Sequence, residues 1–84
     1  MDARRKKLLF QSQHCGMKEN DILLGQFAAT SVRSMPESHL AAFEALLRES
    51  DNDIYDWVIG REPIPARHDN DFMASLLAFN SKSG

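Results

Sequence analysis

His14 and Cys15 are neighbours in the chain, and a thiol beside an imidazole is the combination that makes a cysteine nucleophile with its base. Catalysis by such a pair needs converging side chains and a third group that orients the base, whereas neighbours at a helix end usually point in different directions. The C-terminal end of the helix before Cys15 disfavours a thiolate, whereas the N-terminal end of the helix after it favours one, so the helix dipoles do not indicate an activated thiol. We therefore interpret Cys15 as a small residue at a turn and expect no catalytic residue in this chain.

Acidic residues gather at Asp51, Asp53 and Asp56, where a metal site is conceivable. The segment lacks the glycine and the final glutamate of a calcium-binding loop, so helix capping is the better explanation for these carboxylates. One cysteine and three histidines are too few for a structural zinc site, and a single cysteine excludes an internal disulfide. We expect no metal ion and a reducing compartment.

Two other groups of side chains are candidates for contact with a partner. The basic run from Arg4 to Lys7 suits phosphate or an acidic protein, although a solvated helix face is the simpler interpretation. Tyr55 and Trp57 are aromatic residues of the kind that anchor interfaces; Trp57 suits the core equally well, so Tyr55 is the better surface candidate. The formal net charge of −2 argues against a general nucleic-acid binder.

The elements that must position these residues are helices. Apolar residues recur at intervals of three and four, and no segment shows the alternation of a β-strand. The expected helices cover approximately residues 2–14, 17–31, 34–49, 51–59 and 69–80, with an extended connection over 61–68 that contains Pro63 and Pro65. We predict an all-α fold: a compact five-helix bundle in one domain, residues 1–84, whose ends fray at about 1–3 and 81–84.

Local signals give the ends of several helices. The expected N-terminal caps are Ser34 followed by Pro36, Ser50, and either Asp69 or Asp71. Gly16 and Gly60 are expected to end the first and fourth helices, because glycine reaches positive φ without a steric penalty.

The second helix has the most regular pattern. Its apolar stripe consists of Met17, Asn20, Leu23, Leu24, Phe27 and Ser31, broadened by Ile22 and Ala28. Glu19 and Asp21 lie in its first turn, where the helix dipole favours acids. The segment from His14 to Glu19, which we call the corner, is therefore expected to be a tight glycine turn between two helices.

No apolar run approaches the ~18–20 residues of a membrane span. The basic run at the start leads into only Leu8, Leu9 and Phe10 before polar residues resume. We expect neither a signal peptide nor an anchor, and no direct insertion into a membrane.

Two blocks of the sequence resemble a known family. They are His-Cys-Gly-Met-Lys-Glu-Asn-Asp-Ile-Leu-Leu-Gly-Gln-Phe at residues 14–27 and Tyr-Asp-Trp-Val-Ile-Gly-Arg-Glu-Pro at residues 55–63. Together they resemble the succinate dehydrogenase assembly factor 2 family, the bacterial flavinylation factors, over nearly the whole chain. The family hallmark is Arg-Gly-x-x-Glu at the start of the second helix, and the residues that match the family pattern here are Gly16, Glu19, Asp21, Leu23, Leu24, Phe27 and Ala28.

The resemblance implies a chaperone-like factor, not an enzyme. Such a factor binds the flavoprotein subunit of succinate dehydrogenase or fumarate reductase and promotes covalent attachment of FAD to a histidine of that subunit. It implies that Gly16 allows close approach of the partner and that Glu19 accepts hydrogen bonds from it. The expected partner-binding residues are His14, Cys15, Gly16, Met17, Glu19, Asp21, Tyr55 and Arg4. We expect a monomer when free, with no tightly bound FAD, since a glycine-rich phosphate loop is missing.

The chain departs from the family at one position, because Cys15 stands where the motif has arginine. A thiol offers one weak donor in place of five donors and a permanent charge, so docking is expected to be weaker. The missing targeting segment favours a bacterial cytoplasm over a mitochondrial precursor. A second interpretation is an antitoxin-like regulator that binds a small membrane protein, but the sequence has no DNA-binding helix or disordered neutralising tail to support it.

Overall fold

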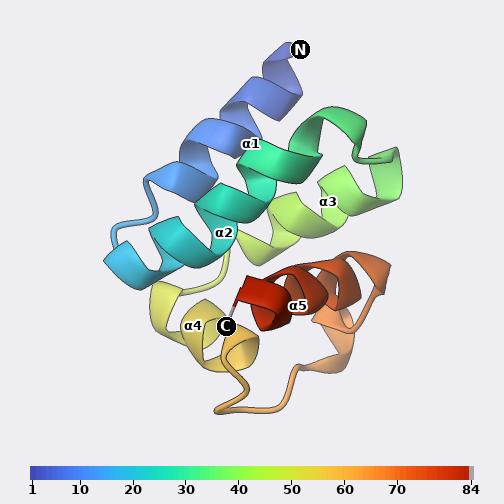
Figure 1. Ribbon diagram of the computed structural model, residues 1–84. Helices are drawn as coiled ribbons and strands as arrows, with labels where there is room; N and C mark the ends of the chain where they lie inside the picture. Colours follow the sequence, from blue (N-terminus) through green and yellow to red (C-terminus); the bar gives the residue numbers. More distant parts are fainter. Residues whose placement is uncertain (84) are drawn as a thin grey trace.

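Five α-helices and two short 3₁₀ helices make up the computed structural model, which describes residues 1–83 (Figure 1). The α-helices are α1 (Ala3–Gln13), α2 (Lys18–Ser31), α3 (Glu37–Leu46), α4 (Asp51–Val58) and α5 (Asp71–Ser83), and the 3₁₀ helices are η1 (Val32–Ser34) and η2 (Ala66–His68). Residues 1–83 contain no strand, which confirms the all-α prediction. Helix α5 continues beyond Ser81, where fraying was expected, and Gly84 lies outside the described residues.

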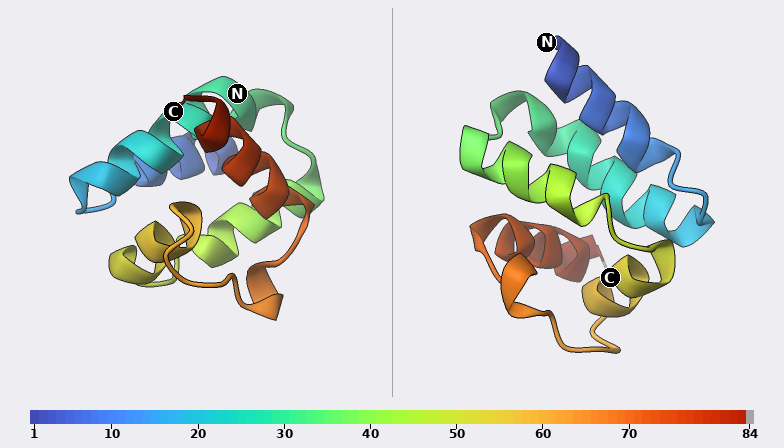
Figure 2. Two further views of the ribbon diagram at one scale, coloured as in Figure 1. Left: turned by 60° about the horizontal axis from the view of Figure 1, so that its bottom comes forward. Right: turned by 180° about the vertical axis from the view of Figure 1, so that it is seen from behind.

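Helices α1 and α2 lie side by side, α3 contacts α1, and α5 packs against both α2 and α3 (Figures 1 and 2). Helix α4 closes the end of the bundle at which α2 begins. This arrangement places the N-terminal turn of α4 next to the turn between α1 and α2. None of the described helices is both long enough and apolar enough to cross a membrane.

Aromatic rings from three helices form the centre of the core. Phe43 on α3 stacks on Phe72 of α5 with ring centroids 4.9 Å apart. Phe27 of α2 meets Phe72 edge to face at 5.8 Å. The predicted inner stripe of α2 is confirmed for Leu24, Phe27 and Ala28, which are buried. Ile22 is instead 50% exposed, so it lies outside the sides of α2 that α1, α4 and α5 cover.

Side-chain caps begin α1, α4 and α5, and in α1 the Asp2 Oδ1 accepts the Arg5 N–H at 2.9 Å. The predicted cap of α4 is confirmed, since the Ser50 hydroxyl accepts the Asp53 N–H. Helix α5 is capped by Asn70, whose Oδ1 accepts the Met73 N–H at 2.9 Å, so the expectation of Asp69 or Asp71 is wrong by one residue. Helix α3 begins after Pro36, and the expected cap Ser34 lies inside η1, where its hydroxyl donates to the Ser31 carbonyl.

The connection between α4 and α5 was expected to be extended and open, and half of that expectation is wrong. Its second half turns into η2, and His68 there is buried, with 4% exposure. The His68 Nε2 lies 2.6 Å from Glu49 Oε2, and its ring lies against Trp57. Hydrogen bonds from Arg67 and His68 hold the pKa of Glu49 below its usual value. These contacts tie the connection to the loop before α4.

Candidate functional site

The corner between α1 and α2 has the geometry that the sequence predicts. Gly16 adopts φ +86°, in the region that disfavours any residue with a side chain. A Cβ at this position would lie 3.3 Å from Asp51 Oδ2 on α4. The backbone conformation therefore favours glycine here, and a Cβ would also be in tight contact with the Asp51 carboxylate.

Two polar contacts brace the corner. The Cys15 N–H donates to Asp21 Oδ1 at 2.6 Å, which links the turn to the first turn of α2. The Asn20 side-chain amide, fully buried, donates to the Asp51 carbonyl at 2.9 Å and thereby ties α2 to the start of α4. The Asn20 Oδ1 has no hydrogen-bond partner among the described residues. Asp21 thus stabilises the corner from within the protein. The sequence did not predict the hydrogen bond from Asn20 to Asp51, because the helical pattern identified Asn20 only as a core-facing residue.

The His14 and Cys15 side chains do not form a nucleophile and base. The Cys15 thiol is half-buried and lies within hydrogen-bonding distance of the carbonyls of Gln11 and Ser12. Burial and the nearby Asp21 and Asp51 raise its pKa to about 11, so the thiol stays protonated at neutral pH. The His14 Nδ1 lies 2.8 Å from the Phe10 carbonyl, and its ring stacks on that of Phe10.

Glu19 is the carboxylate that the corner presents to the outside. It lies on the exposed side of the first turn of α2, and none of the described side chains, those of residues 1–81, pairs with it. Gly16 beside it is also exposed, and Met17 between them is half-buried. An uncommitted carboxylate next to open backbone is suited to hydrogen bonds from a partner.

Arg4 does not belong to the corner, although the sequence placed it among the partner-binding residues. Its Nη2 donates to Glu44 Oε1 at 2.6 Å and its Nη1 to Glu37 Oε1 at 2.6 Å, so it ties the far end of α1 to α3. Its neighbour Arg5 bonds the carbonyls of Val32 and Met35. Arg4 and Arg5, two of the four cations of the basic run, thus bond other residues of the protein.

Tyr55 lies on α4, half-buried, one helical turn after Asp51. This spacing puts it on the side of α4 that Asp51 occupies next to the corner. The structure therefore brings together six of the predicted residues in the corner and the first turn of α2: His14, Cys15, Gly16, Met17, Glu19 and Asp21. Tyr55 lies on the neighbouring helix α4, and Arg4 lies away from the corner.

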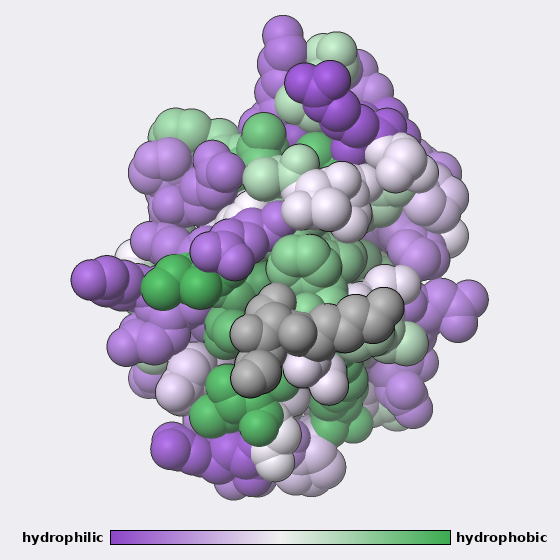
Figure 3. Space-filling view, viewed as in Figure 1, coloured by the Kyte–Doolittle hydropathy of each residue, from purple (hydrophilic) through white to green (hydrophobic). Residues whose placement is uncertain are grey.

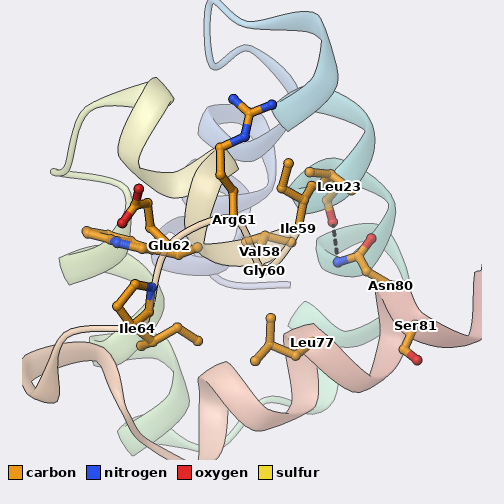
Figure 4. A pocket seen from close by; sticks show the side chains of 12 residues that line it. Leu23, Val58, Ile59, Gly60, Arg61, Glu62, Ile64, Leu77, Asn80 and Ser81 are labelled. Atoms are coloured by element: carbon orange, nitrogen blue, oxygen red, sulfur yellow. Dashed lines mark hydrogen bonds between the residues drawn. The ribbon is translucent and has the colours of Figure 1, made fainter.

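A second concave surface was not anticipated from the sequence. A hollow of about 740 Å³ lies between α2, the end of α4 and α5, and it is bordered by Leu23, Val58, Ile59, Ile64 and Leu77 (Figure 4). Asn80 spans one side and donates to the Leu23 carbonyl at 3.3 Å. Apolar residues are frequent on the lower part of the face in Figure 3, whereas the N-terminal end of α1 is polar.

Within residues 1–83, no three His, Cys, Asp or Glu side chains gather closely enough to hold a metal ion.

Comparison with known proteins identifies similar sequences. A family model described as "Flavinator of succinate dehydrogenase" matches residues 6–80. A Dictyostelium discoideum protein named "Succinate dehydrogenase assembly factor 2, mitochondrial" is 39% identical over 73 residues, which cover 87% of this chain and 52% of that protein. Proteins of the same name from Candida glabrata and Danio rerio are 42% and 38% identical, over 83% and 94% of this chain and 48% and 51% of their own lengths. The chain spans about half the length of the curated relatives it matches.

The expectation of a bacterial cytoplasmic location is wrong. The matched relatives are eukaryotic proteins named as mitochondrial, so they point to mitochondria. The sequence argument relied on a missing targeting segment, and such segments are removed from mature proteins, so their absence does not distinguish the two compartments.

Proposed function

Since this chain belongs to the succinate dehydrogenase assembly factor 2 family, we propose that it binds the flavoprotein subunit of succinate dehydrogenase and promotes covalent attachment of FAD to that subunit. The observation that supports a docking role is the corner: the unpaired Glu19 carboxylate lies beside the exposed backbone of Gly16. The bonds from Cys15 to Asp21 and from Asn20 to Asp51 hold this surface in one shape. A surface that is already ordered loses little entropy on binding.

The chain itself acts as a partner and not as the catalyst in this proposal. A protein that binds one arrangement of the flavoprotein more tightly than others shifts the population toward that arrangement. If the favoured arrangement brings the FAD and the acceptor histidine of the subunit together, bond formation becomes faster without a catalytic group from this chain. FAD is held by the flavoprotein, and the corner supplies binding energy.

The test is the amount of covalent flavin in the flavoprotein subunit, measured by in-gel fluorescence after co-expression in cells that lack their own factor. Covalent flavin is expected with this chain and is expected to fall strongly without it. Equal flavin fluorescence in both samples would refute the proposed function.

Glu19→Gln is expected to weaken binding of the purified flavoprotein subunit about tenfold or more, because a charged acceptor becomes a weaker neutral one in the interface. The melting temperature should not change, since Glu19 is exposed and unpaired within residues 1–83. Asp71→Asn is the matched control, because Asp71 is also an exposed acid in the first turn of a helix, but on α5. A loss of affinity no larger than that of Asp71→Asn would exclude Glu19 from the interface.

Cys15→Arg is expected to increase affinity and covalent flavin, by about threefold to tenfold. The side chain at this position lies in the field of Asp21 and Asp51, and it borders a hollow of about 250 Å³ that has room for a longer side chain. A guanidinium there gains carboxylate partners and presents its remaining donors to the flavoprotein. Cys15→Ser, which removes the thiol without adding charge, serves as the control, and affinity for Cys15→Arg that is no higher than for the original chain would contradict this expectation.

A further inference from the structure

Two hollows run together along the face that α1 shares with the α3–α4 segment. The first, of about 250 Å³, lies beside the corner and is lined by Phe10, Gln11, His14, Cys15, Leu47, Asp51 and Ile54. The second, of about 130 Å³, is lined by Lys7, Gln11, Glu44, Leu47 and Arg48. Gln11 and Leu47 line both hollows, so the two lie next to each other, and we call them together the trough.

The end of the trough away from the corner carries unbalanced positive charge. Arg4 holds the Glu44 carboxylate with two hydrogen bonds, from Nε at 3.1 Å and Nη2 at 2.6 Å, and it also bonds Glu37, so Glu44 is the one carboxylate at this end of the trough. Lys7 and Arg48 add two exposed cations, and neither has a carboxylate partner among residues 1–83. The bonds from Arg4, followed by the charges of Arg48 and Lys7, hold the pKa of Glu44 below its usual value.

The middle of the trough is apolar. Phe10 is 62% exposed although it is a large aromatic residue, and Leu47 opposite is half-buried. At the corner end the sign of the charge changes, because the Asp51 carboxylate lines the first hollow. The trough is therefore positive at one end, apolar in its middle and negative at the other.

We propose that the trough binds an acidic segment of the flavoprotein partner, with its carboxylates at Lys7 and Arg48 and an apolar side chain between Phe10 and Leu47. The inference rests on the proposed function and deepens it, because the trough begins at His14 and Cys15 and so extends the docking surface of the corner. Opposite charge at one end of a groove steers the partner and fixes the direction in which a segment lies. A nucleic acid fits less well, since the apolar middle between Phe10 and Leu47 suits an apolar side chain and offers no partner for a phosphate backbone.

The test uses the double variant Lys7→Glu/Arg48→Glu, with affinity for the purified flavoprotein subunit as the readout. We expect about tenfold weaker binding and a flatter salt dependence than for the unchanged chain. The control is Lys6→Glu/Arg33→Glu, which makes the same change in net charge at two exposed cations outside the trough. Lys6 is the chain neighbour of Lys7 and points to another side of α1, so the control also matches the helix.

The outcomes separate the two proposals. If the unchanged chain does not bind the flavoprotein subunit, the proposed function fails. If it binds and the two double variants lose affinity equally, the trough is not the acidic-segment site and only this inference fails. Polyuridylate that binds the unchanged chain and not the Lys7→Glu/Arg48→Glu variant would assign the trough to nucleic acid and overturn the inference.

A photo-crosslinking residue in place of Gln11 identifies the occupant, because Gln11 is exposed and lines both halves of the trough. The crosslinked peptide of the flavoprotein is expected to be rich in Asp and Glu. A crosslink to a basic segment would contradict the inference.

Discussion

Replacing Asn20 by aspartate is expected to destabilise the protein strongly at neutral pH. Asn20 is fully buried, and its side-chain amide donates to the Asp51 carbonyl at 2.9 Å. Aspartate has the same shape, but it places a carboxylate against that carbonyl and leaves a buried charge without a partner. The expected cost is about 3–5 kcal/mol, which is a large part of the roughly 5–10 kcal/mol that stabilises a domain of this size.

The pH dependence of this variant distinguishes a buried charge from a general packing defect. Burial raises the pKa of the new carboxyl above its unfolded value, so the loss of stability grows as pH rises through the folded pKa and disappears below the unfolded pKa of about 4. Urea unfolding of the variant and the original chain at several pH values measures the difference. Asn20→Leu is the control, because it removes the same hydrogen bond without a charge, and its deficit should not depend on pH. A deficit for Asn20→Asp below about 1 kcal/mol at neutral pH would contradict the buried position of Asn20.

The parts of the fold that sequence predicts are the ones set by neighbouring residues. Gly16 and Gly60 both adopt positive φ, because the end of a helix and the glycine that allows it lie within a few residues of each other. The cap of α4 at Ser50 depends on the N–H of Asp53, three residues away. The spacing of Leu24, Phe27 and Ala28 on one face of α2 likewise follows from the helical period alone.

The contacts that sequence did not predict join residues far apart in the chain. Arg4 bonds Glu37 and Glu44, which lie 33 and 40 residues away, and no local signal distinguishes it from the other cations of the basic run. The 3₁₀ turn at His68 depends on Glu49, 19 residues earlier. Chain spacing carries no information on such pairs, because they form only when the helices have packed.

The candidate site likewise has parts that follow from local sequence and parts that depend on tertiary packing. The turn at Gly16 and the acids of the first turn of α2 follow from local pattern, and the family resemblance named Glu19 as a docking residue. The bracing bond from Asn20 to Asp51 and the trough beside Leu47 depend on where α4 sits relative to α1 and α2. The corner is thus predictable as a turn, whereas its rigidity and its neighbouring surface come from tertiary packing.

Gly16→Val is expected to reduce covalent flavin to the level seen without this chain. A β-branched residue at φ +86° is strained by about 1–3 kcal/mol, and its Cβ would press against the Asp51 carboxylate at 3.3 Å. Asn20 holds the Asp51 backbone in place, so the added side chain is expected to displace the Asp51 carboxylate or the corner itself, and the exposed backbone beside Glu19 changes with it. The added side chain also blocks close approach of a partner. Affinity for the flavoprotein subunit is therefore expected to fall about 100-fold or more, which is the size of loss seen when a residue at the centre of an interface is removed.

Gly60→Val separates this effect from backbone strain alone. Gly60 has nearly the same conformation, φ +84°, but no atom lies within 4 Å of an added Cβ. Both variants are therefore expected to lower the midpoint of thermal unfolding, since both place valine in the left-handed region. Only Gly16→Val is expected to lose binding when both are assayed at a temperature where circular dichroism shows them folded. Equal losses of affinity would mean that stability, and not the surface at the corner, governs how this chain engages the flavoprotein.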